Sequence, residues 1–228
     1  MTKPSYPKTN QEKAKLYLHT MVEVKERLHV IRTILALPIA PLFVQELSYL
    51  QLRYICELIA IACLAAQGDY ETQKAFTESY RPPEIFKKLR ELYPNFFPEC
   101  AERIITFEDG RRHHHVKRGH KPDAYVESDV TKLWQISGDH LHRASVSKYL
   151  RTTFTNQAPD LTGIKAHLHG LVHLLQTHLI PIQKNPDEDV LLLIEMGSHD
   201  QPARMLFVHL NKEDSTTVIE EYTAALQR

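Results

Sequence analysis

Two histidines and an aspartate stand close together in the segment WQISGDHLHRASVS, residues 134–147. The pattern is typical of the last turns of an amphipathic helix, where Asp139 can accept a hydrogen bond from His142 and so orient that imidazole. His140 falls on the other edge of the apolar stripe, because a helix turns about 100° per residue, so the two histidines do not share a pocket. With Arg143 as a cation, the segment has the groups that metal-independent RNA cleavage needs. The open alternative is a core-edge histidine bonded to backbone.

A second group of histidines lies among arginines and lysines in residues 111–121. If the segment is a strand, alternation places His113 and His115 on one face and His114 on the other. Arginines supply bidentate donors for phosphate, whereas neighbouring cations disfavour a divalent metal. The segment is therefore interpreted either as a phosphate-contacting patch or as an ordinary solvated hairpin. The candidate ligand-binding residues are Arg112, His113, His115 and Arg118.

The third group contains His169 and His173, which share one face of a predicted helix. Two ligands do not make a zinc site, the HExxH pattern is absent because Gly170 follows His169, and no acidic residue lies nearby in sequence. We therefore predict no metal site and no cofactor. The histidines of this group are interpreted as a polar or partner-facing stripe.

A charged pair, Arg53 and Glu57, lies one turn apart on a predicted helix that is apolar on nearly all sides from Tyr54 onward. A carboxylate among apolar neighbours needs a partner, and Arg53 is the nearest one. The pair is either a structural ion pair that fixes helix packing or part of a ligand-binding site. We include both residues, together with His140, among the candidate ligand-binding residues.

The elements that must position these groups are mainly helices. Apolar spacing predicts helices over 11–37, from Pro41 to Gln67, from Ser128 onward and over 161–179, with shorter ones at 70–79, after Pro82 and from about Ser215. Two hairpins are predicted, at about 103–118 around Asp109-Gly110 and over 190–210.

This order of elements predicts a mainly α fold, a helical bundle with two small β-hairpins. Residues 1–182 would form the bundle with an inserted hairpin near 101–118. Residues 183–228 would add a C-terminal hairpin and a short helix packed on the same domain.

Composition limits the possible partners and location. The 228 residues include 28 Lys and Arg against 28 Asp and Glu, so no global positive field attracts nucleic acid, and contact must use a local patch. The three cysteines show no CxxC pattern and are expected to be buried thiols. The apolar run 54–66 is too short to cross a bilayer and the first residues lack a signal-peptide core, so we expect a cytoplasmic protein without a membrane contact.

The segments LQLRYICELIA at 50–60 and GDHLHRAS at 138–145, placed after paired long helices, resemble helical bundles of the HEPN group and related bacterial proteins. The resemblance covers about residues 11–150. It implies a helical bundle, often dimeric and frequently tied to RNA or nucleotides. HEPN nucleases carry an arginine followed after four to six residues by a histidine on a helix. Here that spacing occurs at Arg204 and His209, in a segment predicted to be a strand, so the nuclease motif does not transfer.

The sequence therefore predicts a histidine-rich module that binds RNA or a nucleotide phosphate at a cleft. If it cleaves RNA, the candidate catalytic residues are His142 as base, Asp139 as its orienting partner and Arg143 as charge stabiliser. The alternative is a noncatalytic homodimeric or partner-binding module whose histidines respond to pH.

Overall fold

The structure is a computed structural model of the whole chain. It describes residues 9–68, 81–108, 111–119, 121–141, 158–182, 190–210 and 217–222, with backbone only for 108, 111–114, 209–210 and 217–222. The predicted helix at 70–79, the turn at 109–110, the loop at 183–189 and the residues His142 and Arg143 lie outside this part. Helices and an antiparallel sheet make up the fold.

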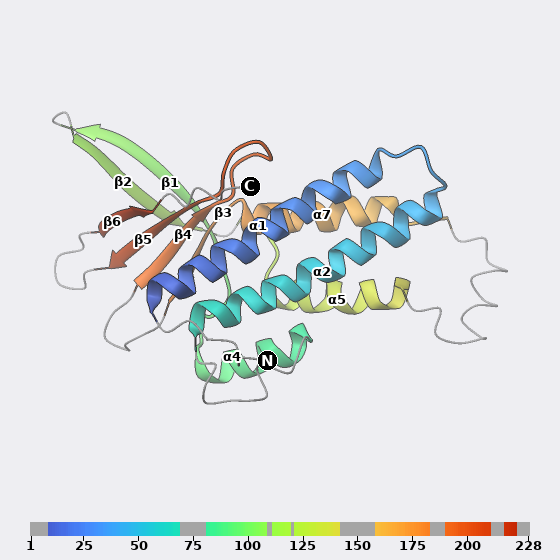
Figure 1. Cartoon of the computed structure of the whole chain (residues 1–228), viewed down its shortest axis with the longest axis horizontal. Helices are drawn as coiled ribbons and strands as arrows, with labels where there is room; N and C mark the ends of the chain where they lie inside the picture. Colours follow the sequence, from blue (N-terminus) through green and yellow to red (C-terminus); the bar gives the residue numbers. More distant parts are fainter. Residues whose placement is uncertain are drawn as a thin grey trace, which may run out of the picture.

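Two long antiparallel helices, α1 (Asn10–Leu35) and α2 (Pro41–Gln67), form the centre of the helical part (Figure 1). A capping box between Thr9 and Glu12 begins α1, because each side chain satisfies a free backbone N–H of the other residue. Pro41 stands in the first turn of α2, and Gly68 ends it in the left-handed conformation, with φ 66°.

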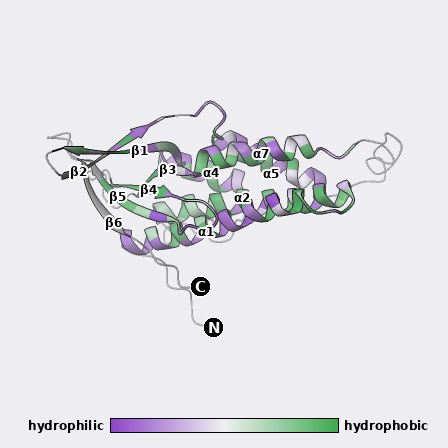
Figure 2. Ribbon diagram, turned by 90° about the horizontal axis from the view of Figure 1, so that it is seen from above, coloured by the Kyte–Doolittle hydropathy of each residue, from purple (hydrophilic) through white to green (hydrophobic). Residues whose placement is uncertain are grey.

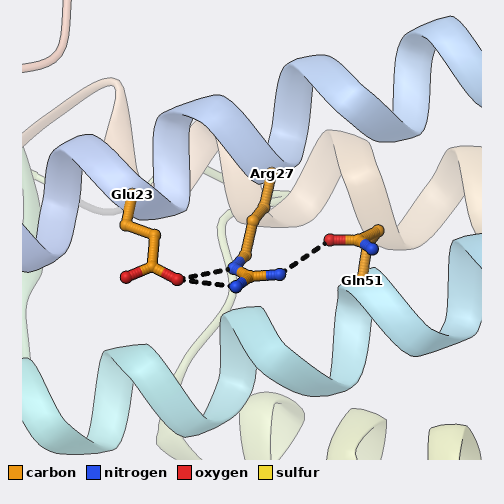
Figure 3. Close-up of polar contacts among 3 residues, drawn as sticks. All are labelled: Glu23, Arg27 and Gln51. Carbon is orange, nitrogen blue, oxygen red and sulfur yellow. Dashed lines mark hydrogen bonds and ion pairs between the residues drawn. The ribbon is translucent and has the colours of Figure 1, made fainter.

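A polar contact joins the two long helices at their partly solvated side (Figure 3). Arg27 of α1 donates to Glu23 Oε1 at 3.0 and 2.6 Å, and to Gln51 Oε1 of α2 at 2.9 Å. The guanidinium carbon also lies 4.7 Å from the centre of the Tyr54 ring. Three partners therefore fix Arg27.

Three further helices pack on α2: α4 (Pro82–Leu92), α5 (Glu127–Leu141) and α7 (Leu161–Leu175). Asp129 accepts from the backbone N–H of Val126 at 3.0 Å and helps to begin α5. Asp160 caps α7 by accepting from the N–H of Gly163 at 2.7 Å. These caps determine where α5 and α7 begin, and therefore where the histidines on the two helices lie.

The strands form one six-stranded antiparallel sheet in the order β2-β1-β3-β4-β5-β6. Their bounds are β1 (Glu99–Glu108), β2 (Arg111–Arg118), β3 (Thr177–Pro181), β4 (Val190–Glu195), β5 (Arg204–Leu210) and β6 (Thr217–Tyr222). β1 and β2 form a ribbon that extends beyond the helices (Figure 1). Arg103 of β1 forms two hydrogen bonds of 2.7 Å with Glu195 of β4, which helps to hold this ribbon on the sheet.

The structure corrects three predictions about the elements. The two hairpins are not separate, because β3 joins them into one sheet with strands from both sides of the predicted boundary at 183–189. The predicted helix over 161–179 ends at Leu175. The residues that follow form β3, where Leu179 packs in an apolar cluster on the outer face of the sheet. The predicted C-terminal helix is instead β6, whose β-branched residues 217–219 favour a strand.

The main core lies between the helices and the inner face of the sheet, and apolar residues line the facing sides of the helices (Figure 2). α2 is the most buried helix, with Ile55, Cys56, Ile59 and Cys63 fully enclosed. The whole helix Pro41–Gln67 is long and apolar enough to cross a membrane by length and composition, although 61% of its most apolar window is buried inside the protein. That degree of burial is typical of a core helix.

Candidate functional site

Arg53 and Glu57, which the sequence selected as a pair, meet α5 in a cluster with Trp134 and Gly138, here called the α2–α5 cluster. Arg53 Nε lies 3.3 Å from Glu57 Oε1, and each side chain is 18% exposed. The Trp134 indole N–H donates to the same carboxylate oxygen at 3.0 Å. The Arg53 guanidinium lies over the Trp134 ring, 4.4 Å from its centre.

Gly138, in the GDHLH segment, makes room for this arginine. A Cβ at Gly138 would lie 2.8 Å from Arg53 Nη1. The guanidinium thus occupies the space beside Gly138 that a larger residue would fill. The α2–α5 cluster therefore has the properties of a structural ion pair, the first of the two interpretations of Arg53 and Glu57.

His140 lies in a different set of contacts, here called the histidine–tyrosine cluster: Tyr49, Tyr125, His140 and His167. The rings of His140 and Tyr49 stack with centroids 3.9 Å apart at 9°. The Gln45 amide donates to His140 Nδ1 over 3.4 Å. The Tyr125 hydroxyl contacts His167 Nδ1, and the Tyr49 and His167 rings meet edge to face at 6.3 Å.

Burial controls the protonation of this cluster. It raises the pKa of Tyr49 to about 12, with a further increase from the carboxylate of Asp160. It also raises the pKa of Tyr125 and lowers the pKa of His167. Tyr49, Tyr125 and His167 are therefore neutral near pH 7, and the Tyr125 hydroxyl is bonded to His167, which makes these three groups poor candidates for binding an anion.

The predicted basic patch on β2 is only partly described. Arg118 donates to Glu99 at 2.9 and 2.7 Å, so its charge is already paired. His115 is exposed and its Nε2 lies 3.0 Å from the Thr106 hydroxyl. The backbones of Arg112 and His113 pair with Phe107 and Thr106, and their side chains lie outside the described part.

A cavity of about 230 Å³, here called the basic cavity, lies between α1, the end of α7 and the segment that joins β4 to β5. Lys25, His29 and Arg32 reach it from one face of α1, at spacings of four and three residues. His199 reaches it from the β4–β5 segment. Its apolar wall consists of Leu28, Val172, Leu175 and Met196.

Two imidazoles stack at this cavity. The rings of His29 and His199 lie with centroids 3.6 Å apart and planes 6° apart. His199 Nδ1 is buried and has no hydrogen-bond partner within the part of the chain that the structure describes. Gly197, with φ 65°, allows the turn that brings His199 against α1.

The two cations of the cavity differ in their surroundings. Lys25 donates to the backbone carbonyl of Gln201, and burial lowers its pKa against the opposing effects of Glu26 and Asp200. Arg32 is exposed, and no ion pair links it to another of the described residues. One guanidinium, one ammonium and the imidazoles of His29 and His199 therefore border the same space. Among the described residues no ion pair engages Arg32 and no hydrogen bond engages His199 Nδ1, which is an arrangement suited to an anion.

The sequence did not predict this site, although part of its signal is present in α1. The apolar stripe of α1 was followed, whereas the basic face Lys25-His29-Arg32 beside it was not. The stacking partner His199 is distant in sequence, so no local spacing predicts it. Of the predicted site residues, the structure joins Arg53 and Glu57 to the GDHLH segment through Gly138 and separates His140 from them into another cluster.

Asp139 is exposed on α5. Its predicted partners His142 and Arg143 lie outside the described residues, so the proposed catalytic group stays a prediction. Comparisons with protein-family models, curated proteins and solved structures find no match for this chain.

Proposed function

We propose that the protein binds a nucleotide through its phosphate, with the phosphate at Lys25, Arg32 and His199 in the basic cavity. The observation that carries this proposal is the buried Nδ1 of His199, which has no hydrogen-bond partner in the part of the chain that the structure describes, in a cavity that two cationic side chains also line. An unsatisfied buried polar atom costs roughly 1–3 kcal/mol, which a ligand oxygen or hydroxyl can recover.

The dimensions of the cavity limit the ligand to a small one. Binding sites for small molecules usually measure about 300–1,000 Å³, and a cavity of about 230 Å³ lies below that range, so it can enclose part of a mononucleotide but not a folded RNA. The apolar wall of Val172, Leu175 and Met196 offers contact for a base or sugar, whereas the basic side of α1 offers contact for phosphate. The HEPN resemblance implies the same class of ligand.

The experiment is calorimetric titration with adenosine monophosphate, adenosine and inorganic phosphate. We expect the nucleotide to bind and adenosine to bind at least tenfold more weakly, because the charge-assisted bonds require the phosphate. Arg32→Gln and Lys25→Gln should each weaken nucleotide binding by about ten- to a hundredfold, since a hydrogen bond to a charged group contributes about 1.5–3 kcal/mol.

Matched controls come from the same helix. Lys15→Gln removes an exposed lysine outside the cavity, and Arg27→Gln removes an arginine bound to Glu23 and Gln51. Neither should change nucleotide affinity. Equal binding of adenosine and its monophosphate, or equal losses in the cavity and control variants, would refute the proposal.

A second candidate, a homodimer, is favoured by an exposed apolar patch at the turn between α1 and α2. The exposed fractions there are 42% for Leu37, 40% for Ile39, 44% for Leu42, 55% for Phe43 and 41% for Leu47. Contiguous exposed apolar surface is typical of an interface. Sedimentation of the wild type and Phe43→Glu between pH 5.5 and 8 tests it: a dimer lost in the variant supports this candidate, and a monomer throughout rejects it.

RNA cleavage by His142, Asp139 and Arg143 and a cytoplasmic location stay predictions from the sequence. Incubation of mixed RNA with the wild type and His142→Ala tests the first. Identical digestion by both proteins would reject His142 as the base.

A further inference from the structure

A second group of side chains, distinct from the basic cavity, lies where the segment before α5 crosses α7. His169 and His173 lie one turn apart on α7, and Asp123 comes from the turn between β2 and α5. One donor atom from each of the three lies within 4.8 Å of the others. His169 Nε2 lies 3.9 Å from Asp123 Oδ2. We propose that these three residues bind a divalent transition metal ion.

The fold fixes the aspartate over the two histidines through contacts that do not involve the donors themselves. The backbone N–H of Tyr125 donates to the carbonyl of Gly170 at 3.2 Å. The Tyr125 hydroxyl contacts His167, which lies one turn before Gly170 on α7. A Cβ at Gly170 would lie 2.2 Å from the Tyr125 ring, so only glycine allows this close approach.

This explains Gly170, the residue that breaks the HExxH pattern. Within the sequence HGLVH it supplies no ligand, but it lets the segment carrying Asp123 pack against α7. The acidic ligand that the sequence lacked beside the two histidines therefore comes from 46 residues upstream of His169. Two imidazoles and one carboxylate are a frequent donor set for zinc and related metals.

The distances suit a site that closes slightly on binding. Donors of a four-coordinate zinc ion lie about 2.0–2.2 Å from the metal, and therefore roughly 3.4 Å from one another. Asp123 and His169 are 69% and 57% exposed at their side chains, so small rotations can shorten the present separations. His173 is half-buried, and its Nδ1 has no hydrogen-bond partner among the described residues. The two imidazoles favour zinc, cobalt or nickel over magnesium or calcium.

The test is titration of tag-free protein with Zn²⁺ by calorimetry, and with Co²⁺ by visible absorption. The wild type should bind one ion at this site, with protein nitrogen ligands seen in the Co²⁺ spectrum. Asp123→Asn, His169→Asn and His173→Asn should each weaken binding at least tenfold. Far-UV circular dichroism should be unchanged, since Asp123 and His169 are exposed.

Two controls separate this site from other histidines. His19→Asn removes an exposed histidine of α1, and a triple His→Asn variant at 113–115 removes the run on β2. Both should bind as the wild type does. Unchanged affinity in Asp123→Asn and His173→Asn, or loss of binding in the triple variant alone, would overturn the proposal. Nucleotide binding in the basic cavity is measured separately, so either proposal can fail without the other.

Discussion

The α2–α5 cluster and the basic cavity each contain an arginine near a ring side chain, but their polar atoms are bonded differently. In the α2–α5 cluster, Glu57 accepts from Trp134 and pairs with Arg53, whose guanidinium also covers the indole. In the basic cavity, Arg32 and His199 line open volume, and His199 Nδ1 has no hydrogen-bond partner among the described residues. The first arrangement stabilises helix packing, whereas the second leaves polar groups available to bind a ligand. Which atoms are already satisfied therefore distinguishes a structural cluster from a ligand site.

The two regions should differ most in how much their side chains contribute to the free energy of unfolding. Trp134→Ala removes a ring that packs on Arg53 and an N–H that Glu57 accepts, so we expect a loss of about 3–4 kcal/mol in the free energy of unfolding. Arg32→Ala removes an exposed side chain and should cost less than about 0.5 kcal/mol. Urea unfolding of both variants measures the contrast. Similar losses in the two would contradict it.

A second comparison concerns two imidazoles, His178 and His199. His178 is fully buried with both nitrogens bonded: Nδ1 donates to the carbonyl of Leu175 at 2.9 Å, and Nε2 accepts from the Tyr17 hydroxyl at 2.8 Å. Burial lowers the pKa of His178 to about 4, against 6.5 for the ordinary group. The unfolded chain therefore binds the proton more readily than the folded one.

The lower pKa of His178 makes the free energy of unfolding depend on pH. Stability from neutral His178 is fully present above about pH 6.5, falls as the pH decreases through the window from 6.5 to 4, and is lost below 4. The total is about 3 kcal/mol. Urea unfolding at pH 7 and pH 4.5 measures this change, and His178→Gln should reduce the slope of the free energy of unfolding against pH. Equal slopes in wild type and His178→Gln would reject the assignment.

The smallest expected effect tests the role of Gly138. In an Arg53→Met background, Gly138→Ala should stabilise the protein by roughly 0.5–1 kcal/mol, because alanine favours the helix. In the wild type the added Cβ displaces Arg53 Nη1 and the gain should disappear. A double-mutant cycle by thermal unfolding gives the coupling. Additive changes would mean that Gly138 makes no room for Arg53.

The sequence predicted the local elements well wherever one segment carried its own signal. Pro41 and Gly68 mark the ends of α2, and the charged pair Arg53 and Glu57 stood out among apolar neighbours. The predictions of the C-terminal end of α7 and of a helix over residues 217–222 were wrong, because pairing with neighbouring strands determines both. Strand pairing is a long-range contact that periodicity does not contain.

The candidate sites depend on long-range contacts even more than the helices and strands do. Stacking of His29 on His199 and the approach of Asp123 to His169 each join segments far apart in the sequence. Their local signals were the basic face of α1, the HxxxH spacing and the glycines Gly170 and Gly197. These signals suggest that something is bound or packed there, but the partner becomes visible only in the folded chain.

Nuclear magnetic resonance of protein labelled with ¹⁵N in its histidine side chains, titrated with adenosine monophosphate, shows most directly whether the basic cavity binds the nucleotide. Single His→Asn variants assign the signals. We expect the imidazole signals of His29 and His199 to shift with nucleotide, while those of His140 and His167 stay in place. Shifts confined to His140 and His167, with His29 and His199 unmoved, would contradict nucleotide binding in the basic cavity.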